Sequence, residues 1–321
     1  MEDFHIASIV VSTIRNAPVL MFAAMAGLFA ERSGVVDIGL EGKILASAFA
    51  SASVAYATQN PWLGILAGVG VSVVLAMIQA FVSITQKGNQ LVCGIAINIA
   101  MSGLTFVLAQ FFFHEGGRTP DLREARLFDI VLPGTAALDN IPFVGWLYGH
   151  VIGGQSALVY LAFILIPIVH WVIYHSRFGL RLRACGENPH AADAAGVSVE
   201  RTRYLAMLVA GVLCSFSGAY LAIVQSGFFL RDMSAGAGYL ALTTLVFGNW
   251  RPLHTVLGCL MFGLFGAIQI QLEGVDLPLV GQVSGSLIQM IPYVVTVIVL
   301  AGFMAKSVAP KAAGKPFVKS R

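Results

Sequence analysis

The chain has 321 residues, of which 57% are hydrophobic and only 11% are charged, with a net charge of +3. Because soluble domains carry about 25% charged residues, this composition excludes an ordinary soluble domain. Repeated apolar runs of about 20 residues instead predict an all-α fold, a polytopic transmembrane helical bundle.

The first apolar run covers residues 4–30 and contains Arg15 three residues before Pro18. Two interpretations fit: a break between an interfacial segment and a half helix, or a buried charge paired with Glu41. We favour the break, because proline disfavours helical geometry at the residue before it. The acidic N-terminus lacks the basic region of a signal peptide, so we expect the first span to be retained.

Eight more crossings are predicted from the apolar runs at residues 39–57, 62–85, 91–113, 156–175, 204–225, 239–250, 253–272 and 281–303. The longest polar stretch, residues 114–155, mixes charges of both signs with Gly and Pro, and predicts an extramembrane loop with one short surface helix. Together with the first run this makes nine crossings, within an expected range of eight to ten.

Basic residues set the expected orientation, because cytoplasmic loops carry an excess of Lys and Arg. The tail, residues 304–321, has five basic residues and no acid, and the segment 176–203 is rich in Arg. Both are therefore placed in the cytoplasm, whereas the N-terminus and residues 114–155 fall outside. We expect a transmembrane domain over residues 1–303 and a basic cytoplasmic tail over residues 304–321.

A polar, glycine-interrupted segment at residues 31–42 runs directly into an apolar helix. Carboxylates at the edge of hydrocarbon are costly, and irregular backbone survives there only when it is buried in protein or lines a wet cavity. We interpret residues 35–42, with Asp37 and Glu41, as a helix entry facing the bundle interior; the alternative is a short solvated turn. Residues 236–241 begin another short apolar helix from the opposite side, which indicates an inverted repeat of broken helices unless the Gly/Ala-rich similarity is accidental.

Polar residues inside the predicted spans are the candidates for a solute pathway, because intramembrane polar groups need a partner or a substrate. For each of them, hydrogen bonding between helices is the alternative. The candidates are Asp37, Glu41, Asn98, Thr243, Thr244, Gln269 and Gln289. Four aromatic residues could stack on a nucleobase, although the lipid interface is favoured for them: Phe228, Phe229, Tyr239 and Trp250.

The sequence contains no motif of a zinc protease, a serine hydrolase or a nucleotide-binding P-loop. The four cysteines are scattered, without a CxxC pair or a nearby histidine cluster, and are expected to be small buried apolar residues. We therefore expect no enzymatic activity, no metal and no cofactor.

The most informative cytoplasmic stretch is residues 177–197. Asn188 can cap a helix with Pro189 at its first position, alanines continue that helix, and Gly196 ends it. The expected product is a short helix with a small-residue face beside an exposed Glu187, which the backbone of another protein could approach closely. The alternative is an ordinary structured loop.

Three segments resemble the permeases of ABC importers for sugars, nucleosides and branched-chain amino acids. RFGLRLRACGENPHAADAAGVSVERTR (residues 177–203) is similar to the cytoplasmic coupling loop of that group. ERSGVVDIGLEGKILASAFA (residues 31–50) is similar to its ERSGVxNIGLEG segment, with Asp37 where the family usually has Asn. SAGAGYLALTTLVFGNWRPL (residues 234–253) is similar to the counterpart in the second half. The resemblance spans roughly residues 17–303 and is greatest for the nucleoside-type branch.

The resemblance implies a multi-pass subunit in the inner membrane of a bacterium, surrounded by lipid, that conducts a small solute and has no ATPase of its own. It implies an ATP-binding ABC subunit, a second permease subunit that is related or identical, and an extracytoplasmic solute-binding protein as partners, with no role for nucleic acid. The ATP-binding subunit would contact the coupling loop through Gly186, Glu187, Asn188, Pro189, Ala192, Ala195 and Gly196.

Two alternatives stay open at this point. The same machinery could carry a simple sugar or a branched-chain amino acid instead of a nucleoside. A secondary transporter driven by an ion gradient is less favoured, because such a carrier has no need of a loop that docks an ATPase.

Overall fold

The computed structural model describes residues 2–130, 153–272 and 308–319, together with residues 149, 276–277, 281–282, 290, 294 and 297. The helices formed by the predicted apolar runs are α1 (Glu2–Arg32), α2 (Leu40–Thr58), α3 (Pro61–Ala80), α4 (Gln90–Phe113), α7 (Ala157–His175), α10 (Val199–Ala219), α11 (Ala237–Phe247) and α12 (Pro252–Leu272). The other described elements are η1 (Phe81–Thr85), η2 (Arg123–Ala125), α8 (Arg177–Glu187), α9 (Pro189–Ala194), η4 (Tyr220–Ser226) and the antiparallel two-residue strands β1 (Asp276–Leu277) and β2 (Gly281–Gln282). The predicted helical bundle is confirmed.

Six described helices are long and apolar enough to cross a membrane: α1, α3 with η1, α4, α7, α10 with η4, and α12. The helix α11 has 11 residues, and α2 has 19 but carries Glu41 and Lys43 near its start. These eight helices correspond to the first eight predicted crossings. The ninth, residues 281–303, lies largely outside the described residues.

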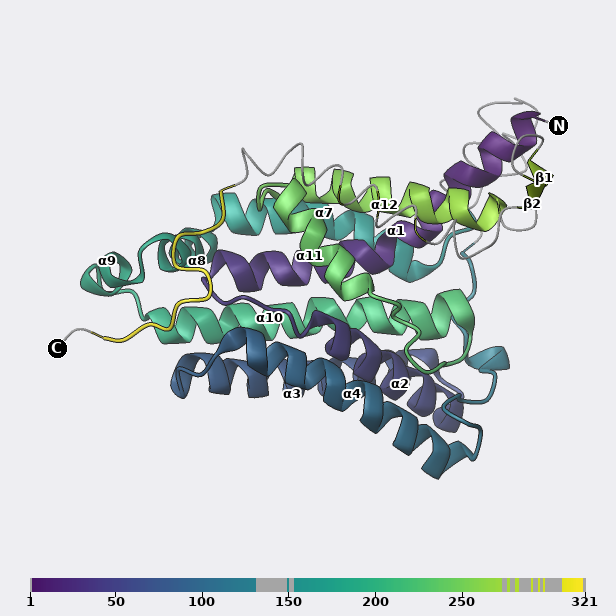
Figure 1. Cartoon of the computed structure of the whole chain (residues 1–321), viewed down its shortest axis with the longest axis horizontal. Coiled ribbons are helices and arrows are strands. Elements are labelled where there is room, and N and C mark those ends of the chain that lie inside the picture. Colours follow the sequence, from purple (N-terminus) through teal and green to yellow (C-terminus); the bar gives the residue numbers. More distant parts are fainter. Residues whose placement is uncertain are drawn as a thin grey trace.

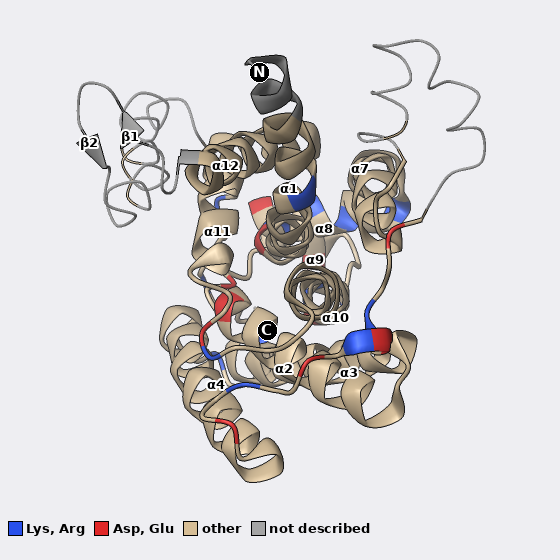
Figure 2. Cartoon of the chain, turned by 90° about the vertical axis from the view of Figure 1, so that its right-hand side faces the viewer, with Lys and Arg blue, Asp and Glu red and all other residues tan. Residues whose placement is uncertain are grey.

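The helices α1 and α10 lie in the centre of the bundle, with the other long helices around them (Figure 2). The second half of α1, residues 17–30, is apolar on all sides and buried throughout, as expected for a helix without a polar face. Small residues on α10 allow close packing, because a Cβ at Gly218 would lie 2.1 Å from Ser47 Oγ of α2. Ser217 Oγ also donates a hydrogen bond to the Val19 carbonyl of α1 at 2.8 Å, a contact typical of packed membrane helices.

The expected break in α1 is wrong, because the helix continues through Pro18. The Tyr220 hydroxyl donates to the Arg15 carbonyl at 2.7 Å, one turn before the proline. Pro18 removes the helical hydrogen bond to the carbonyl four residues earlier, that of Ile14, and membrane helices tolerate this loss where they pack against neighbouring helices. Arg15 does not pair with Glu41 either, since its guanidinium donates to the Asp129 carboxylate at 2.9 Å.

The two ends of the bundle carry different segments (Figure 1). One end holds the start of α1 and residues 114–130, and the other holds α8, α9 and the C-terminal residues 308–319. The predicted topology requires this separation, because it places the basic loop and the tail together in the cytoplasm. At the opposite end, Thr119 N donates to the Phe229 carbonyl at 3.0 Å, and η2 is the short surface helix expected there.

The helices α2 and α11 enter the bundle from opposite ends after non-helical backbone. Residues 33–39 follow α1 at the end that carries α8 and α9, whereas residues 227–236 follow η4 at the other end (Figure 1). The starts of α2 and α11 contact each other inside the bundle, where Gly238 N donates to the Glu41 carboxylate. This is the arrangement of broken helices that the inverted-repeat interpretation predicts.

Candidate functional site

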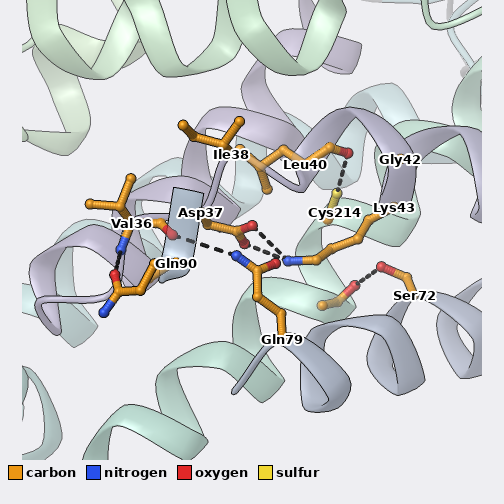
Figure 3. Close-up of polar contacts among 12 residues, drawn as sticks. Val36, Asp37, Ile38, Leu40, Gly42, Lys43, Ser72, Gln79, Gln90 and Cys214 are labelled. Carbon is orange, nitrogen blue, oxygen red and sulfur yellow. Dashed lines mark hydrogen bonds and ion pairs between the residues drawn. The ribbon is translucent and has the colours of Figure 1, made fainter. Parts of the chain in front are cut away.

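The entry to α2 contains a fully buried ion pair. Lys43 Nζ donates to both carboxylate oxygens of Asp37, at 2.7 and 2.6 Å, and neither side chain is exposed (Figure 3). Either charge alone would lose its hydration without compensation, so the two are tolerated only together. The pair therefore fastens residues 35–39 to the first turns of α2.

Two glutamines from neighbouring helices hold the same entry segment. Gln90 Oε1, at the start of α4, accepts a hydrogen bond from Val36 N at 2.8 Å, and Gln79 Nε2 of α3 donates to the Val36 carbonyl at 3.4 Å (Figure 3). A Cβ at Gly39 would lie 2.8 Å from Gln79 Oε1, so glycine allows this close approach. The two glutamine side chains thus supply hydrogen-bond partners to the non-helical backbone, as its position inside the bundle requires.

Asn98 of α4 joins the starts of α2 and α11. Its Oδ1 accepts a hydrogen bond from Gly42 N at 2.8 Å, and its Nδ2 donates to the Ile38 carbonyl at 3.0 Å and to the Tyr239 hydroxyl at 2.8 Å. The side chain is 8% exposed. In this conformation both amide hydrogens of the predicted pathway residue are engaged within the protein.

Glu41 caps the N-terminus of α11 from a different helix. Its Oε1 accepts hydrogen bonds from Ser234 Oγ at 2.7 Å and Gly236 N at 2.8 Å, and its Oε2 accepts one from Gly238 N at 2.7 Å. The N-cap residue of α11 is Gly236, which has no side chain for this purpose. Glu41 therefore supplies both the missing acceptors and a negative charge at the positive end of the helix.

The junction between α2 and α11 borders an exposed face that carries several polar groups. Tyr239 is 46% exposed, and Thr243 lies one turn further along α11, where its hydroxyl donates to the Tyr239 carbonyl at 3.0 Å. On α4, Ser102 lies one turn after Asn98 and donates to the Asp232 carboxylate at 2.6 Å. The junction thus presents hydroxyl, amide and carboxylate groups beside each other.

The remaining predicted pathway residues lie elsewhere. Thr244 is buried, and its hydroxyl donates to the Ala241 carbonyl at 2.6 Å. Gln269 is half-buried on α12, and Gln289 lies outside the described residues. Within the described part of the chain, no group of three or more His, Cys, Asp or Glu side chains is placed to hold a metal ion.

Two aromatic residues that were expected at the lipid interface lie in the core instead. Phe229 is fully buried and packs edge-on against Phe49, with ring centroids 5.2 Å apart. Trp250 is 6% exposed, and its indole N–H donates to the Glu31 carboxylate. The indole gives this buried carboxylate the hydrogen-bond donor that it requires.

The short helix predicted after Asn188, at the corner of the bundle beside α8, is α9. Asn188 Oδ1 accepts a hydrogen bond from Ala191 N at 3.1 Å, and Pro189 stands in the first turn. Gly196 follows the helix with φ +82°, a left-handed conformation that favours glycine. The cap, the proline and the terminating glycine are therefore confirmed as local structure.

A shallow groove of about 520 Å³ runs between α8 and α9. Its walls are largely apolar, and Leu180 on α8 is 63% exposed. Glu187 is exposed at its edge, but Ala192 is 5% exposed and belongs to a buried cluster with Phe317. Gly186 also faces inwards, because a Cβ there would lie 2.3 Å from the Arg32 carbonyl. The lining residues are Arg177, Leu180, Arg181, Ala184, Glu187, Asn188, Ala191, Ala192, Ala195 and Val197.

The C-terminal residues 308–319 pack against this corner (Figure 1). Ala312 N donates to the Gly186 carbonyl at 2.8 Å, and Arg203 Nη1 donates to the Lys315 carbonyl at 3.3 Å. Phe317 is 6% exposed and shares a buried cluster with Cys185. The tail therefore packs against α8 and α9 and helps to hold them in place.

The packing of the tail predicts a protected thiol. Burial raises the pKa of Cys185, so the reactive thiolate is scarce at neutral pH. We expect Phe317→Ala to increase maleimide labelling of Cys185 about tenfold, measured by mass spectrometry in a Cys93→Ser background. The exposed neighbour Val318 is the control, and Val318→Ala should leave the rate unchanged. A wild-type rate for Phe317→Ala would show that the tail does not shield the thiol.

Residues 9–300 match the protein family described as "Branched-chain amino acid transport system / permease component". The chain belongs to this family. This permease is 34% identical to the nucleoside ABC transporter permease protein NupC of Lactococcus lactis, over 94% of each chain. It is 32% identical to the guanosine ABC transporter permease protein NupQ of Bacillus subtilis over the full length of both chains. It is also 32% identical, over 85% of its length and 80% of the relative's, to TsgC13 of Haloferax volcanii, provisionally named a glucose ABC transporter permease.

These comparisons confirm the predicted family and, with the apolar helices, the multi-pass location in a bacterial cell membrane. The protein is a membrane-spanning permease component of an ABC transporter. Sequence reasoning missed Lys43 as the partner of Asp37, although a lysine inside an apolar run, six residues after a carboxylate, is a usable signal. It also missed Ser234 and the backbone of Gly238 as partners of Glu41, for which the sequence contains no local signal.

Proposed function

We propose that this permease is the nucleoside-conducting subunit of an ATP-driven importer. The observation that carries the proposal is the junction at which Glu41 and Asn98 join two broken helices from opposite sides. Transporters of several folds place their solute sites at such a meeting of discontinuous helices. The names of the relatives NupC and NupQ support nucleosides as the solute class.

The chemistry of the exposed face suits a nucleoside. Tyr239 exposes a phenol ring that can stack on a base, and Thr243 adds a hydroxyl one turn away that can meet a ribose hydroxyl. The adjoining face of α4 exposes Ile99, which is 70% accessible. A second permease subunit, related or identical, would cover this face and enclose the path between the two copies.

The remaining predicted residues would act from within the protein. Asp37 holds the entry segment, Thr244 is buried behind Thr243 on α11, and Gln269 lies on α12. They would set the shape and the electric field of the path without direct contact with solute. Gln289 remains a predicted pathway residue.

ATP hydrolysis is assigned to a separate ATP-binding subunit that docks in the groove between α8 and α9. A short chain of contacts leads from this groove to the junction: Gly186 packs against the Arg32 carbonyl, and Arg203 Nε donates to the Ser33 carbonyl at 3.1 Å. Arg32 and Ser33 directly precede the entry segment of α2. Movement of α8 and α9 would therefore be transmitted to α2, while an extracytoplasmic binding protein delivers solute at the opposite end.

The docking role predicts uncoupled variants. Ala195→Trp fills the groove and Glu187→Lys reverses an exposed charge at its edge. We expect each to lower ATP-dependent uptake at least about tenfold, while the ATP-binding subunit keeps its basal hydrolysis. Glu200→Lys, an exposed acid at the start of α10 outside the groove, is the matched control. Normal uptake in both groove variants would remove the docking role from α8 and α9.

The solute is tested with the complete transporter in proteoliposomes. ATP-dependent uptake of labelled guanosine should be reduced by excess unlabelled adenosine or uridine, and not by glucose or leucine. The similarity to TsgC13 makes a sugar the second candidate. Competition by glucose without competition by nucleosides would favour the sugar and overturn the proposed solute class.

A further inference from the structure

A basic pocket lies at the cytoplasmic end, separate from the groove between α8 and α9. It forms where the ends of α1 and α7 meet α8 and the start of α12, and its volume is about 690 Å³. None of the acidic side chains that the structure describes lines it. Its cationic and titratable walls are Arg32, Arg183, Arg251, His170, His175 and His254. The transport function proposed above gives these side chains no role.

Two arginines of the pocket are held by neighbouring groups and still have N–H donors without a partner. Arg32 Nε and Nη2 donate to the Trp250 carbonyl at 2.9 and 2.6 Å, which leaves three of the five N–H donors of its guanidinium. Arg183 lies over the Tyr174 ring, 5.0 Å from its centroid. Arg183 Nε and His170 Nδ1 are buried without a hydrogen-bond partner. Buried polar atoms are usually satisfied, so the Arg183 Nε–H lacks an acceptor.

Two carboxylates lie near the pocket, but neither lines it. Glu31 is engaged by the indole N–H of Trp250 and does not line the pocket. Glu187 interacts electrostatically with Arg32, but its side chain lies at the edge of the other groove. An anionic ligand therefore meets several cations and no lining carboxylate among the described residues.

The surroundings of the pocket match the inner membrane surface. The helix α7 ends at His175 and α12 begins at Pro252, so the pocket lies where two spans meet the cytoplasm. Exposed apolar side chains lead to it along both helices, among them Ile168 at 46% and Leu257 at 63% exposure. Trp171 is 60% exposed and stands where interfacial aromatic residues are enriched.

We propose that this pocket binds the phosphate group of an anionic lipid headgroup. Arginine guanidinium groups bind phosphate oxygens in a bidentate manner, and basic pockets between membrane helices on the cytoplasmic side suit lipid phosphates. The acyl chains would lie along the exposed apolar surfaces of α7 and α12. The pocket would anchor the cytoplasmic ends of α1, α7, α8 and α12 to the inner leaflet.

Native mass spectrometry of the full-length protein in detergent tests this site. Arg251 and His254 are exposed, so Arg251→Gln/His254→Gln should fold normally, which the melting temperature without added lipid checks. We expect the double variant to bind phosphatidylglycerol at least about fivefold more weakly than the wild type, from the loss of one or more cations. Phosphatidylcholine binding should not change. Arg201→Gln, on the same end but outside the pocket, should behave as the wild type.

A second arm separates lipid from a free anion as the source of the phosphate group. Inorganic phosphate is added at millimolar concentration as a competitor and as the sole ligand. Failure to displace phosphatidylglycerol supports the lipid headgroup. Displacement, with phosphate binding that depends on Arg251, would overturn the lipid assignment in favour of a free anion. Equal phosphatidylglycerol binding by the wild type and the double variant would overturn the site itself. None of these results depends on which solute is transported.

Discussion

Replacing Glu41 with alanine should lower uptake at least about tenfold and loosen the start of α11. The carboxylate accepts three hydrogen bonds, from Ser234 Oγ, Gly236 N and Gly238 N, at 2.7, 2.8 and 2.7 Å. Hydrogen bonds to a charged group contribute about 1.5–3 kcal/mol each, and an orphaned buried donor adds a penalty. Since the three bonds are coupled, we expect a destabilisation of about 3 kcal/mol instead of their sum.

Two measurements check the role of Glu41. Hydrogen exchange should accelerate at the first amides of α11, and ATP-dependent uptake should fall at least about tenfold. Glu41→Gln keeps one acceptor oxygen and should lie between the wild type and Glu41→Ala. Glu115→Ala, which removes an exposed acid at the end of the bundle opposite α8 and α9 (Figure 1), should change neither quantity. Unchanged exchange in α11 together with normal uptake would refute the capping role.

Breaking the Asp37–Lys43 pair should destabilise the protein more than any surface substitution. Both side chains are fully buried, with Lys43 Nζ 2.6 Å from one carboxylate oxygen. Lys43→Met leaves an uncompensated buried carboxylate and should reduce the free energy of unfolding by about 3–5 kcal/mol. Asp37→Asn leaves a buried ammonium group and should act in the same direction. The double variant Asp37→Asn/Lys43→Met should recover to within about 1 kcal/mol of the wild type, because neutral replacements of a buried pair are tolerated.

Unfolding in mixed detergent gives the full double-mutant cycle for this pair. The exposed pair Arg118–Asp121, with side chains 43% and 62% accessible, is the matched control. Arg118→Met should cost less than about 1 kcal/mol. Single variants of Asp37 and Lys43 that are as stable as the wild type would mean that the pair does not hold the entry segment.

The sequence was sufficient for features with local causes. Apolar runs predicted the eight helices α1–α4, α7 and α10–α12, six of which are long and apolar enough to cross a membrane. Asn188, Pro189 and Gly196 predicted α9 because a cap, a fixed φ and a left-handed terminator act within a few residues. Asp37 and Glu41 were singled out correctly as costly charges that need partners.

The partners of Glu41 could not be predicted, because they depend on how distant segments pack. Glu41 is 193 residues from Ser234 and 197 from Gly238. The local rule for Pro18 failed because α10 and η4 pack against α1, and this packing keeps the helix continuous. Trp250 was misplaced for a similar reason: its indole is held by Glu31, a contact across most of the chain.

The central claim is that solute passes along the face beside the α2–α11 junction, and cysteine accessibility at Thr243 tests it most directly. Thr243→Cys is built in a background without the four native cysteines and reconstituted with its partners in proteoliposomes. A membrane-impermeant maleimide should label it from one side without nucleotide and from the other side when ATP is trapped, and nucleoside should slow the labelling. A labelling rate that changes with neither trapped ATP nor added nucleoside would contradict the account.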